Sequence, residues 1–269
     1  MPREITSHGN ALLKRIRSLR EKKHRRAEAL FLAEGLRILT EAADAGHLPR
    51  YLVFAGDGAT HPLAERLITA TEAAGGEAIA TTTDILRKLS GKDNPQAVLG
   101  VYPEFPVALD TIDRMQAPIW LVVQSMRDPG NLGTVLRTGD AIGAGGVILI
   151  DDCCDPFSVE AVRASMGALF TQRIAMARWP DFIQWLRDGP GQLVGTSLNT
   201  QFDYQQPDYQ PPVFIVTGNE QSGLPPEYEG QCDLLVKIPM LGRADSLNAA
   251  VATGVMGYEV LNQIRRRTA

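Results

Sequence analysis

The chain has 269 residues, of which 44% are hydrophobic and 22% charged, and its net charge is −4, a profile typical of a globular protein with one large or two smaller domains. This composition argues against a membrane protein, because no apolar run approaches the roughly 18 residues of a membrane span, and the first ten residues do not form a secretory signal. Three cysteines, two of them adjacent, provide neither a disulfide framework nor zinc-ligand spacing, so we expect a cytoplasmic protein without a metal or a membrane partner.

Positive charge is concentrated near the amino terminus. Residues 1–50 hold eleven basic and six acidic side chains, whereas the rest of the chain has a net charge of −9. An apolar stripe that includes Leu12, Ile16 and Leu19 predicts helix over residues 11–45, with basic residues on the other faces. This basic arm, residues 14–26, either is a solvated helix face or contacts the phosphates of a polyanion. The candidate contacts are Lys14, Arg15, Arg17, Lys22, Lys23, Arg25 and Arg26.

The rest of the first hundred residues alternates between strand and helix patterns. Strands are predicted at 50–56, 76–83 and 97–103, and helices at 61–76 and 84–90. This alternation indicates a small α/β domain over residues 1–105. Residues 106–117 are expected to be a linker, because the surrounding stretch has three prolines and mixed polarity.

Residues 118–269 predict a second α/β domain on a mostly parallel sheet. Continuous apolar runs, typical of strands covered on both faces, occur at 119–126, 146–151, 173–177, 191–198, 212–220 and 232–240. Helical patterns lie between or after them, at 132–142, 158–170, 182–189 and 246–267. Ligands bind such sheets at the carboxyl ends of the strands, so those ends are the place to look for a site.

Two strand ends of this domain carry loops that suit a ligand. In "VTGNEQSGLPPE", Gly218 follows a strand, and glycine lets a backbone approach a ligand closely. In "IPMLGRADSLNAA", Ile238 and Leu247 offer apolar walls for an adenine, and Ser246 is expected to cap the closing helix. Taken singly, each loop is more often an ordinary turn.

The helix in "DPGNLGTVLRTGDAIGAGG" places Arg137 among apolar and small residues, with Asn131 as the expected N-cap. Taken alone, such an arginine is more often a surface residue than a site residue. The "GAGG" at its end follows a helix rather than a strand, which argues against a dinucleotide-binding oxidoreductase. A Ser-His-Asp set is excluded in the carboxyl-terminal half, which has no histidine.

Taken together, three stretches resemble the signature motifs of the SpoU (TrmH-like) RNA ribose 2′-O-methyltransferases of the SPOUT superfamily. They are "DPGNLGTVLRTGDAIGAGGVIL", "VTGNEQSGLPPE" and "IPMLGRADSLNAAVATGVMGYE", in the order and spacing of that family, and "VRASMGALF" resembles its intervening segment. The stretch "NALLKRIRSLREKKHRRAEALFLAEGLRILTEA" is similar to the RNA-binding domain often fused to this fold.

The resemblance implies an α/β trefoil-knot methyltransferase domain over residues 118–269 that binds S-adenosyl-L-methionine, with a small α/β RNA-binding domain before it. It also implies a homodimer in which the partner chain completes each site. The expected reaction is methyl transfer to a ribose 2′-hydroxyl of structured RNA. Ribosomal RNA is the first expectation for the substrate; transfer RNA, or a catalytically silent RNA-binding knot protein, are the alternatives.

The same resemblance, taken position by position, implies the site residues. The catalytic set is Arg137, Asn131, Glu220, Ser246 and Asn248, and the cofactor pocket is formed by Ser197, Leu198, Gly218, Glu220, Ile238, Met240, Gly242 and Leu247. Because a guanidinium stays protonated, we expect Arg137 to grip the phosphate beside the reacting ribose and to stabilise the developing alkoxide. The other catalytic residues would hold this arginine and the nucleotide in place.

Overall fold

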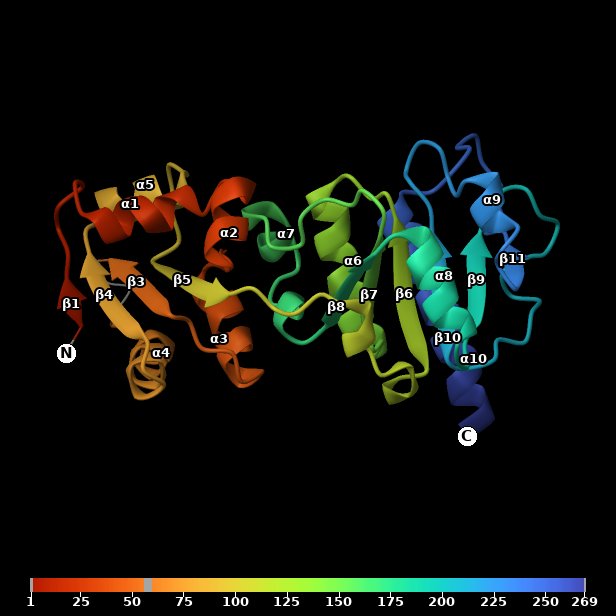
Figure 1. Cartoon of the computed structure of the whole chain (residues 1–269), viewed down its shortest axis with the longest axis horizontal. Helices are drawn as coiled ribbons and strands as arrows, with labels where there is room; N and C mark the ends of the chain where they lie inside the picture. The colour runs from red at the N-terminus through yellow and green to blue at the C-terminus, as the bar shows by residue number, and fades with distance from the viewer. Residues whose placement is uncertain (1, 56–59, 269) are drawn as a thin grey trace. The chain divides into compact units, whose positions relative to one another are not determined.

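The computed structural model describes residues 2–55 and 60–268, and the chain divides into two compact units (Figure 1). Unit 1 consists of Met1–Phe105 and Asp155–Thr171, and unit 2 consists of Pro106–Cys154 and Gln172–Ala269. The segment expected to be a linker, 106–117, is therefore part of unit 2, where it forms the 3-10 helices η2 (Leu109–Thr111) and η3 (Arg114–Gln116). The Arg114 guanidinium lies 3.9 Å from the Trp185 ring centre and ties this segment to unit 2.

Unit 1 is built on a five-stranded mixed sheet in the order β1–β4–β3–β5–β2. Its strands are β1 (Arg3–Glu4), β2 (Leu30–Glu34), β3 (Tyr51–Ala55), β4 (Glu77–Thr81) and β5 (Val98–Pro103). Its helices are α1 (Ala11–Ser18), α2 (Lys22–Glu28), α3 (Leu36–Asp44), α4 (Pro62–Ala73), α5 (Thr83–Ser90) and α7 (Val159–Ala164). The last residue of the expected strand 50–56, Gly56, lies outside the described residues. In the core, α1 and α5 pack Ile16 and Leu89 against Leu32 and Val53 of the sheet.

The prediction of continuous helix over residues 11–45 is wrong. Three helices share this range with strand β2, whose five residues are all buried and which pairs antiparallel with β5. Ala29, with a φ of 50°, ends α2 in the left-handed region just before the strand. At the end of β2, Glu34 accepts hydrogen bonds from Ser90 Oγ (2.6 Å), Lys92 Nζ (2.7 Å) and the Gln96 amide (3.1 Å).

The segment 155–171 returns from unit 2 to pack within unit 1. Phe157 and Phe170 lie with their ring centres 5.1 and 5.9 Å from that of Phe31. The helix expected over 158–170 is only α7, because Met166 and Gly167 both have positive φ values and break it before the 3-10 helix η4 (Ala168–Phe170). Contacts with residues more than 100 positions earlier therefore hold this segment.

Unit 2 contains a six-stranded sheet in the order β11–β9–β10–β6–β7–β8, and every pairing in it is parallel. Its strands are β6 (Ile119–Gln124), β7 (Gly146–Ile150), β8 (Arg173–Ala177), β9 (Gln192–Thr196), β10 (Val213–Thr217) and β11 (Leu234–Val236). Its helices are α6 (Pro129–Ile142), α8 (Trp179–Arg187), α9 (Pro226–Glu229) and α10 (Ala249–Thr268). The predicted parallel sheet is confirmed.

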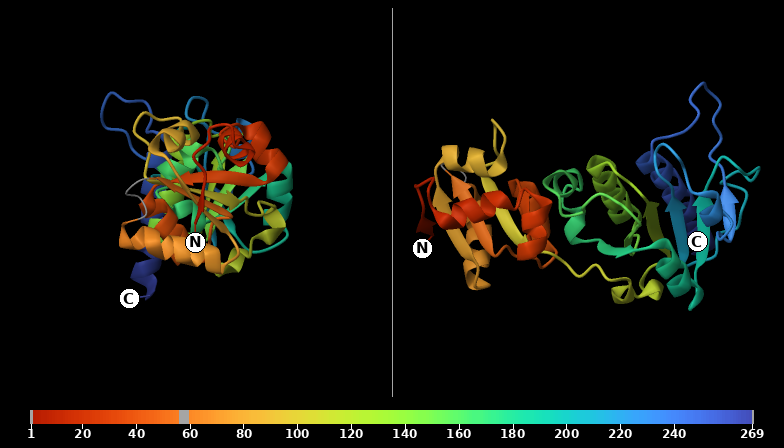
Figure 2. Two further views of the ribbon diagram at one scale, coloured as in Figure 1. Left: turned by 90° about the vertical axis from the view of Figure 1, so that its left-hand side faces the viewer. Right: turned by 45° about the horizontal axis from the view of Figure 1, so that its top comes forward.

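Helices cover both faces of this sheet because successive strand residues point in opposite directions. On β6, Trp120 joins the aromatic core that α8 supplies through Phe182, whereas its neighbour Leu121 lies close to Gly139 of α6 and Gly257 of α10. The segment between β11 and α10, residues 237–248, extends beyond the sheet as a long loop (Figure 2). Among the described residues, no helix combines the length and the apolar character needed to cross a membrane.

Candidate functional site

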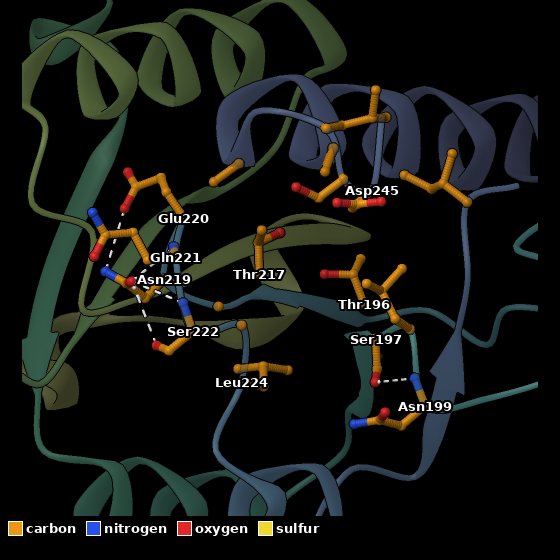
Figure 3. Close-up of a pocket in the computed structure, with 18 of the residues that line it drawn as sticks. Thr196, Ser197, Asn199, Thr217, Asn219, Glu220, Gln221, Ser222, Leu224 and Asp245 are labelled. Atoms are coloured by element: carbon orange, nitrogen blue, oxygen red, sulfur yellow. Dashed lines mark hydrogen bonds between the residues drawn. The ribbon is translucent and has the colours of Figure 1, made fainter. Parts of the chain in front are cut away.

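A pocket of about 450 Å³ lies at the carboxyl ends of β9, β10 and β11 (Figure 3). Since these three strands are neighbours and parallel, their carboxyl ends meet at one edge of the sheet. The pocket is lined by residues 196–199 after β9, residues 217–224 after β10, and residues of the loop and first turn that connect β11 to α10. This is the edge at which open parallel sheets bind their ligands.

Seven of the eight expected cofactor residues line this pocket: Ser197, Leu198, Gly218, Glu220, Ile238, Met240 and Leu247. The eighth, Gly242, does not line it and lies exposed in the loop 237–248. Glycine is required at position 218, because a Cβ there would lie 2.3 Å from the backbone of both Gly223 and Leu224. At Gly242, by contrast, a Cβ would meet nothing within 4 Å.

Polar side chains from three distant segments form a chain of hydrogen bonds that ends at Glu220. Asn131 Nδ2, on α6, donates to Glu220 Oε1 over 3.1 Å, and Asn248 Nδ2 donates to Asn131 Oδ1 over 3.0 Å. The second carboxylate oxygen of Glu220 accepts from Asn219 Nδ2, 3.3 Å away. We call Asn131, Asn219, Glu220 and Asn248 the amide–carboxylate network. Three of its members belong to the expected catalytic set.

The family model of the SpoU rRNA Methylase family matches residues 118–258, and that of the MRM3-like substrate binding domain matches residues 10–100. The chain belongs to the SpoU rRNA methylase family. The predicted family and its α/β methyltransferase fold are thus confirmed.

Individual SpoU proteins match this chain over nearly its whole length. The 23S rRNA (uridine(2479)-2′-O)-methyltransferase of Streptomyces viridochromogenes is 31% identical over 99% of this chain and 95% of its own. The 23S rRNA (guanosine(2553)-2′-O)-methyltransferase RlmP of Bacillus subtilis is 26% identical over 96% of this chain and 99% of its own. The AdoMet-bound rRNA methyltransferase from Sinorhizobium meliloti has a TM-score of 0.90 at 40% identity, covering 99% of this chain and 98% of that one.

The helix caps of this SpoU chain differ from expectation in two places. Asp128, not Asn131, caps α6: its Oδ1 accepts from the Asn131 amide over 2.7 Å, and Pro129 occupies the first helical position. Asn248, not Ser246, caps α10, because its Oδ1 accepts from the amides of Ala250 (3.0 Å) and Val251 (3.3 Å). The cap at Asp128 leaves the Asn131 side chain available to bind Glu220.

The structure does not bring Arg137 into the pocket of its own chain. Arg137 lies on the exposed side of α6, and within the part of the chain that the structure describes it makes no hydrogen bond or ion pair. Ser246 lines the pocket but belongs to no hydrogen-bonded cluster among the described residues. The expected catalytic set therefore separates into three hydrogen-bonded residues (Asn131, Glu220 and Asn248), a serine in the pocket and an exposed arginine.

Several pocket residues were missed by the sequence analysis, including Asn199, Asn219, Glu229 and Asp245. Asn219 carried a signal, since asparagine after a strand favours a tight turn. Its Oδ1 accepts from the Gln221 amide over 3.0 Å, and its carbonyl from the Gly223 amide over 2.9 Å. No pattern in the sequence indicated Glu229, because it reaches the pocket only through the position of α9 beside β9 in the fold.

In unit 1, five of the seven predicted RNA contacts are exposed and form no ion pair with any other described residue: Lys14, Arg17, Lys22, Lys23 and Arg26. Arg15 is exposed but forms an ion pair with Glu28. Arg25 corrects the prediction, because it is 3% exposed and bound to Asp155 over 2.6 Å, so its guanidinium cannot reach a phosphate. Its burial follows from the return of segment 155–171, which no local pattern indicates.

Proposed function

We propose that this chain transfers a methyl group from S-adenosyl-L-methionine to a ribose 2′-hydroxyl of ribosomal RNA, in the cytoplasm and as a homodimer. The observation that carries the proposal is the amide–carboxylate network, which joins segments of all three motifs beside one pocket. The relatives support ribosomal RNA over transfer RNA, since both described above are named for 23S rRNA.

The residues of the pocket fit the cofactor. A volume of about 450 Å³ is within the range of small-molecule sites. Ile238 and Leu247 supply apolar surface for an adenine, and the backbone at Gly218 borders the pocket without a side chain. The carboxylates of Glu220 and Asp245 suit a ligand whose reactive centre is cationic. The methyl group on a sulfonium is already activated, so the proposed chemistry requires no metal.

The residues of the chain then have to hold the hydroxyl in line and manage its proton. Asn131 and Asn219 occupy both oxygens of the Glu220 carboxylate, which fixes its orientation at the pocket wall. Asn248 holds Asn131 in turn, so the position of this carboxylate depends on the first turns of α6 and α10. A carboxylate held in this way would offer a nucleotide at the pocket an acceptor of fixed orientation.

Arg137 would act from a second copy of the chain. It is exposed and lies outside the pocket of its own chain, which supports a site completed across a dimer. A guanidinium can bind a phosphate with two parallel hydrogen bonds and also stabilise a developing alkoxide. Its role is thus to position the RNA and to stabilise charge.

The decisive experiment compares Arg137→Ala and Arg137→Lys with the native enzyme. Both variants should bind S-adenosylhomocysteine within about threefold of the native affinity by calorimetry. Methyl transfer to ribosomal RNA should fall about 100- to 1000-fold, also for lysine, which lacks the planar fork. Near-native turnover of Arg137→Ala would remove this residue from the mechanism. Transfer RNA as the only methylated substrate would overturn the proposed RNA class.

The exposed cations of the basic arm would contact RNA phosphates and position the substrate. Each neutralised phosphate releases counterions, so RNA affinity should fall steeply as salt is raised. Lys22→Ala and Lys23→Ala should each weaken binding of any RNA sequence and lower the slope of log affinity against log salt by about one. An unchanged salt dependence in these variants would mean that the basic arm does not contact RNA and is a solvated helix face.

A further inference from the structure

The proposed mechanism leaves one polar cluster of the pocket unused. Glu229, at the end of α9, accepts a hydrogen bond from Ser197 Oγ over 2.5 Å and from Asn199 Nδ2 over 3.2 Å. Ser197 Oγ in turn accepts from the Asn199 amide over 2.9 Å. All three residues line the pocket, so this cluster presents a carboxylate whose orientation is fixed by neutral donors.

The cluster lies on the opposite side of the pocket from Glu220. Figure 3 shows Glu220 and Asn219 on one side and Ser197 and Asn199 on the other, with Thr217 between them. The transferable methyl group must lie near the amide–carboxylate network if that network serves the reaction. Glu229 is therefore placed to meet a part of the cofactor remote from the methyl group.

The apolar wall of the pocket borders the same cluster. Val236 of β11 pairs with Thr196 of β9, the residue before Ser197, and Ile238 continues the wall beyond the strand. An adenine packed on this wall would have its ribose beside Ser197 and Glu229. The ribose links the adenine to the sulfonium, so this position agrees with a methyl group directed toward Glu220.

The chemistry of the cluster fits a vicinal diol. A carboxylate offers about four lone-pair sites, and the donors of Ser197 and Asn199 leave some of them available. The two ribose hydroxyls can donate to these sites, as they do to the acidic residue of dinucleotide-binding folds. The cofactor's ammonium group would also attract a carboxylate, but it lies on the other side of the sulfonium from the ribose.

We propose that Glu229, oriented by Ser197 and Asn199, binds the 2′- and 3′-hydroxyls of the cofactor ribose and selects for a ribonucleoside cofactor. This inference rests on the proposed function, because it assigns one subsite of the same pocket. Hydrogen bonds to a charged group are stronger than neutral ones, and one such bond corresponds to about a tenfold change in affinity or more.

The test is calorimetry with S-adenosylhomocysteine and its 2′,3′-dideoxyribose analogue, using the native chain, Glu229→Gln and Glu227→Gln. Glu227 is an exposed carboxylate on the same helix that does not line the pocket, so it is the matched control. We expect Glu229→Gln to weaken S-adenosylhomocysteine about tenfold and the dideoxy analogue less than twofold. Glu227→Gln should bind both ligands as the native chain does.

The outcomes separate this inference from the proposed function. An equal loss of affinity for both ligands in Glu229→Gln would mean that Glu229 only shapes the pocket. No loss of affinity for either ligand would mean that Glu229 does not contact the ribose. Either result overturns this inference and leaves the proposed methyltransferase function standing. Failure of the folded native chain to bind S-adenosylhomocysteine would overturn the proposed function itself, and this inference with it.

Discussion

The Arg25–Asp155 ion pair should be a major stabilising contact of unit 1. Arg25 Nη2 and Nε lie 2.6 and 3.2 Å from Asp155 Oδ2, and Nη1 donates to the carbonyls of Leu19 (2.9 Å) and Arg20 (2.8 Å). The two side chains are only 4% and 13% exposed. Arg25→Ala would therefore leave a carboxylate and two carbonyls without these donors in a site almost closed to water.

Removing one partner of a buried pair costs about 3–5 kcal/mol in the free energy of unfolding. Because the Asp155 carboxylate keeps some contact with water, we expect the lower end, about 3 kcal/mol, for Arg25→Ala. Asp155→Ala deletes the same contact, so the double variant should be less destabilised than the sum of the single variants by about 1–3 kcal/mol.

Urea denaturation followed by far-UV circular dichroism would measure this effect, because all three tryptophans lie in unit 2 and their fluorescence would not report on unit 1. Arg26→Ala is the matched control, since Arg26 is the exposed neighbour. It should change stability by less than about 0.5 kcal/mol and reduce the salt dependence of RNA binding. The reasoning fails if Arg25→Ala loses under 1 kcal/mol, or if it changes the salt dependence as Arg26→Ala does.

Three further predictions follow from burial and close approach. Gly218→Ala should abolish binding of S-adenosylhomocysteine in calorimetry, because a Cβ at position 218 would collide with the backbone. Gly242→Ala is the control and should bind it as the native chain does, because the space around position 242 is open. Equal binding by the two variants would contradict the close approach at position 218. Burial by itself would raise the pKa of Glu34, but hydrogen bonds from Lys92 and its other partners outweigh burial and lower the pKa. The ionised carboxylate therefore stabilises the folded chain above the ordinary carboxyl pKa of about 4.3, and this stabilisation is lost as pH falls through the folded pKa. Glu34→Gln should therefore flatten the acid side of the stability profile measured by circular dichroism, and an unchanged profile would refute this assignment. Burial raises the pKa of the Cys153 thiol to about 11, so at pH 8 iodoacetamide should label it, as read by peptide mass spectrometry, far more slowly in the folded chain than in urea; equal rates would show that the thiol is accessible.

The parallel sheet of unit 2 could be predicted because each of its strands is a continuous apolar run between turn signals. Strand β2 could not, because its residues "LFLAE" lie between helical patterns, and a buried strand and a buried helical turn have the same apolar composition. Only its pairing with β5, nearly seventy residues later, selects the strand. The packing of segment 155–171 within unit 1 could not be predicted either, because it depends on contacts with Arg25 and Phe31, which are distant in the sequence.

The candidate site was predictable where a motif places a residue type at a strand end, and less so where capping residues compete. Asp128 and Asn131 are both good N-cap residues, and Pro129 at the first helical position was the available signal for Asp128. Ser246 and Asn248 compete in the same way before α10, without such a proline to decide between them. Glu229 reaches the pocket only through the packing of α9 beside β9, which no spacing in the sequence encodes.

The two caps also explain how the amide–carboxylate network keeps its geometry. Asn248 uses its oxygen to cap α10 and its amide nitrogen to hold Asn131, so one side chain connects a helix end to the network. Asn131 lies in the first turn of α6, and its hydrogen bond places Glu220 beside that turn, where backbone dipoles favour negative charge. Because α6 and α10 pack on each other and on the sheet, Asn131 and Asn248, two of the four network residues, are anchored to the core, whereas Asn219 holds the carboxylate from the loop after β10. Loss of any one member removes a hydrogen-bond partner from its neighbour, so the network couples three segments that lie far apart in the chain.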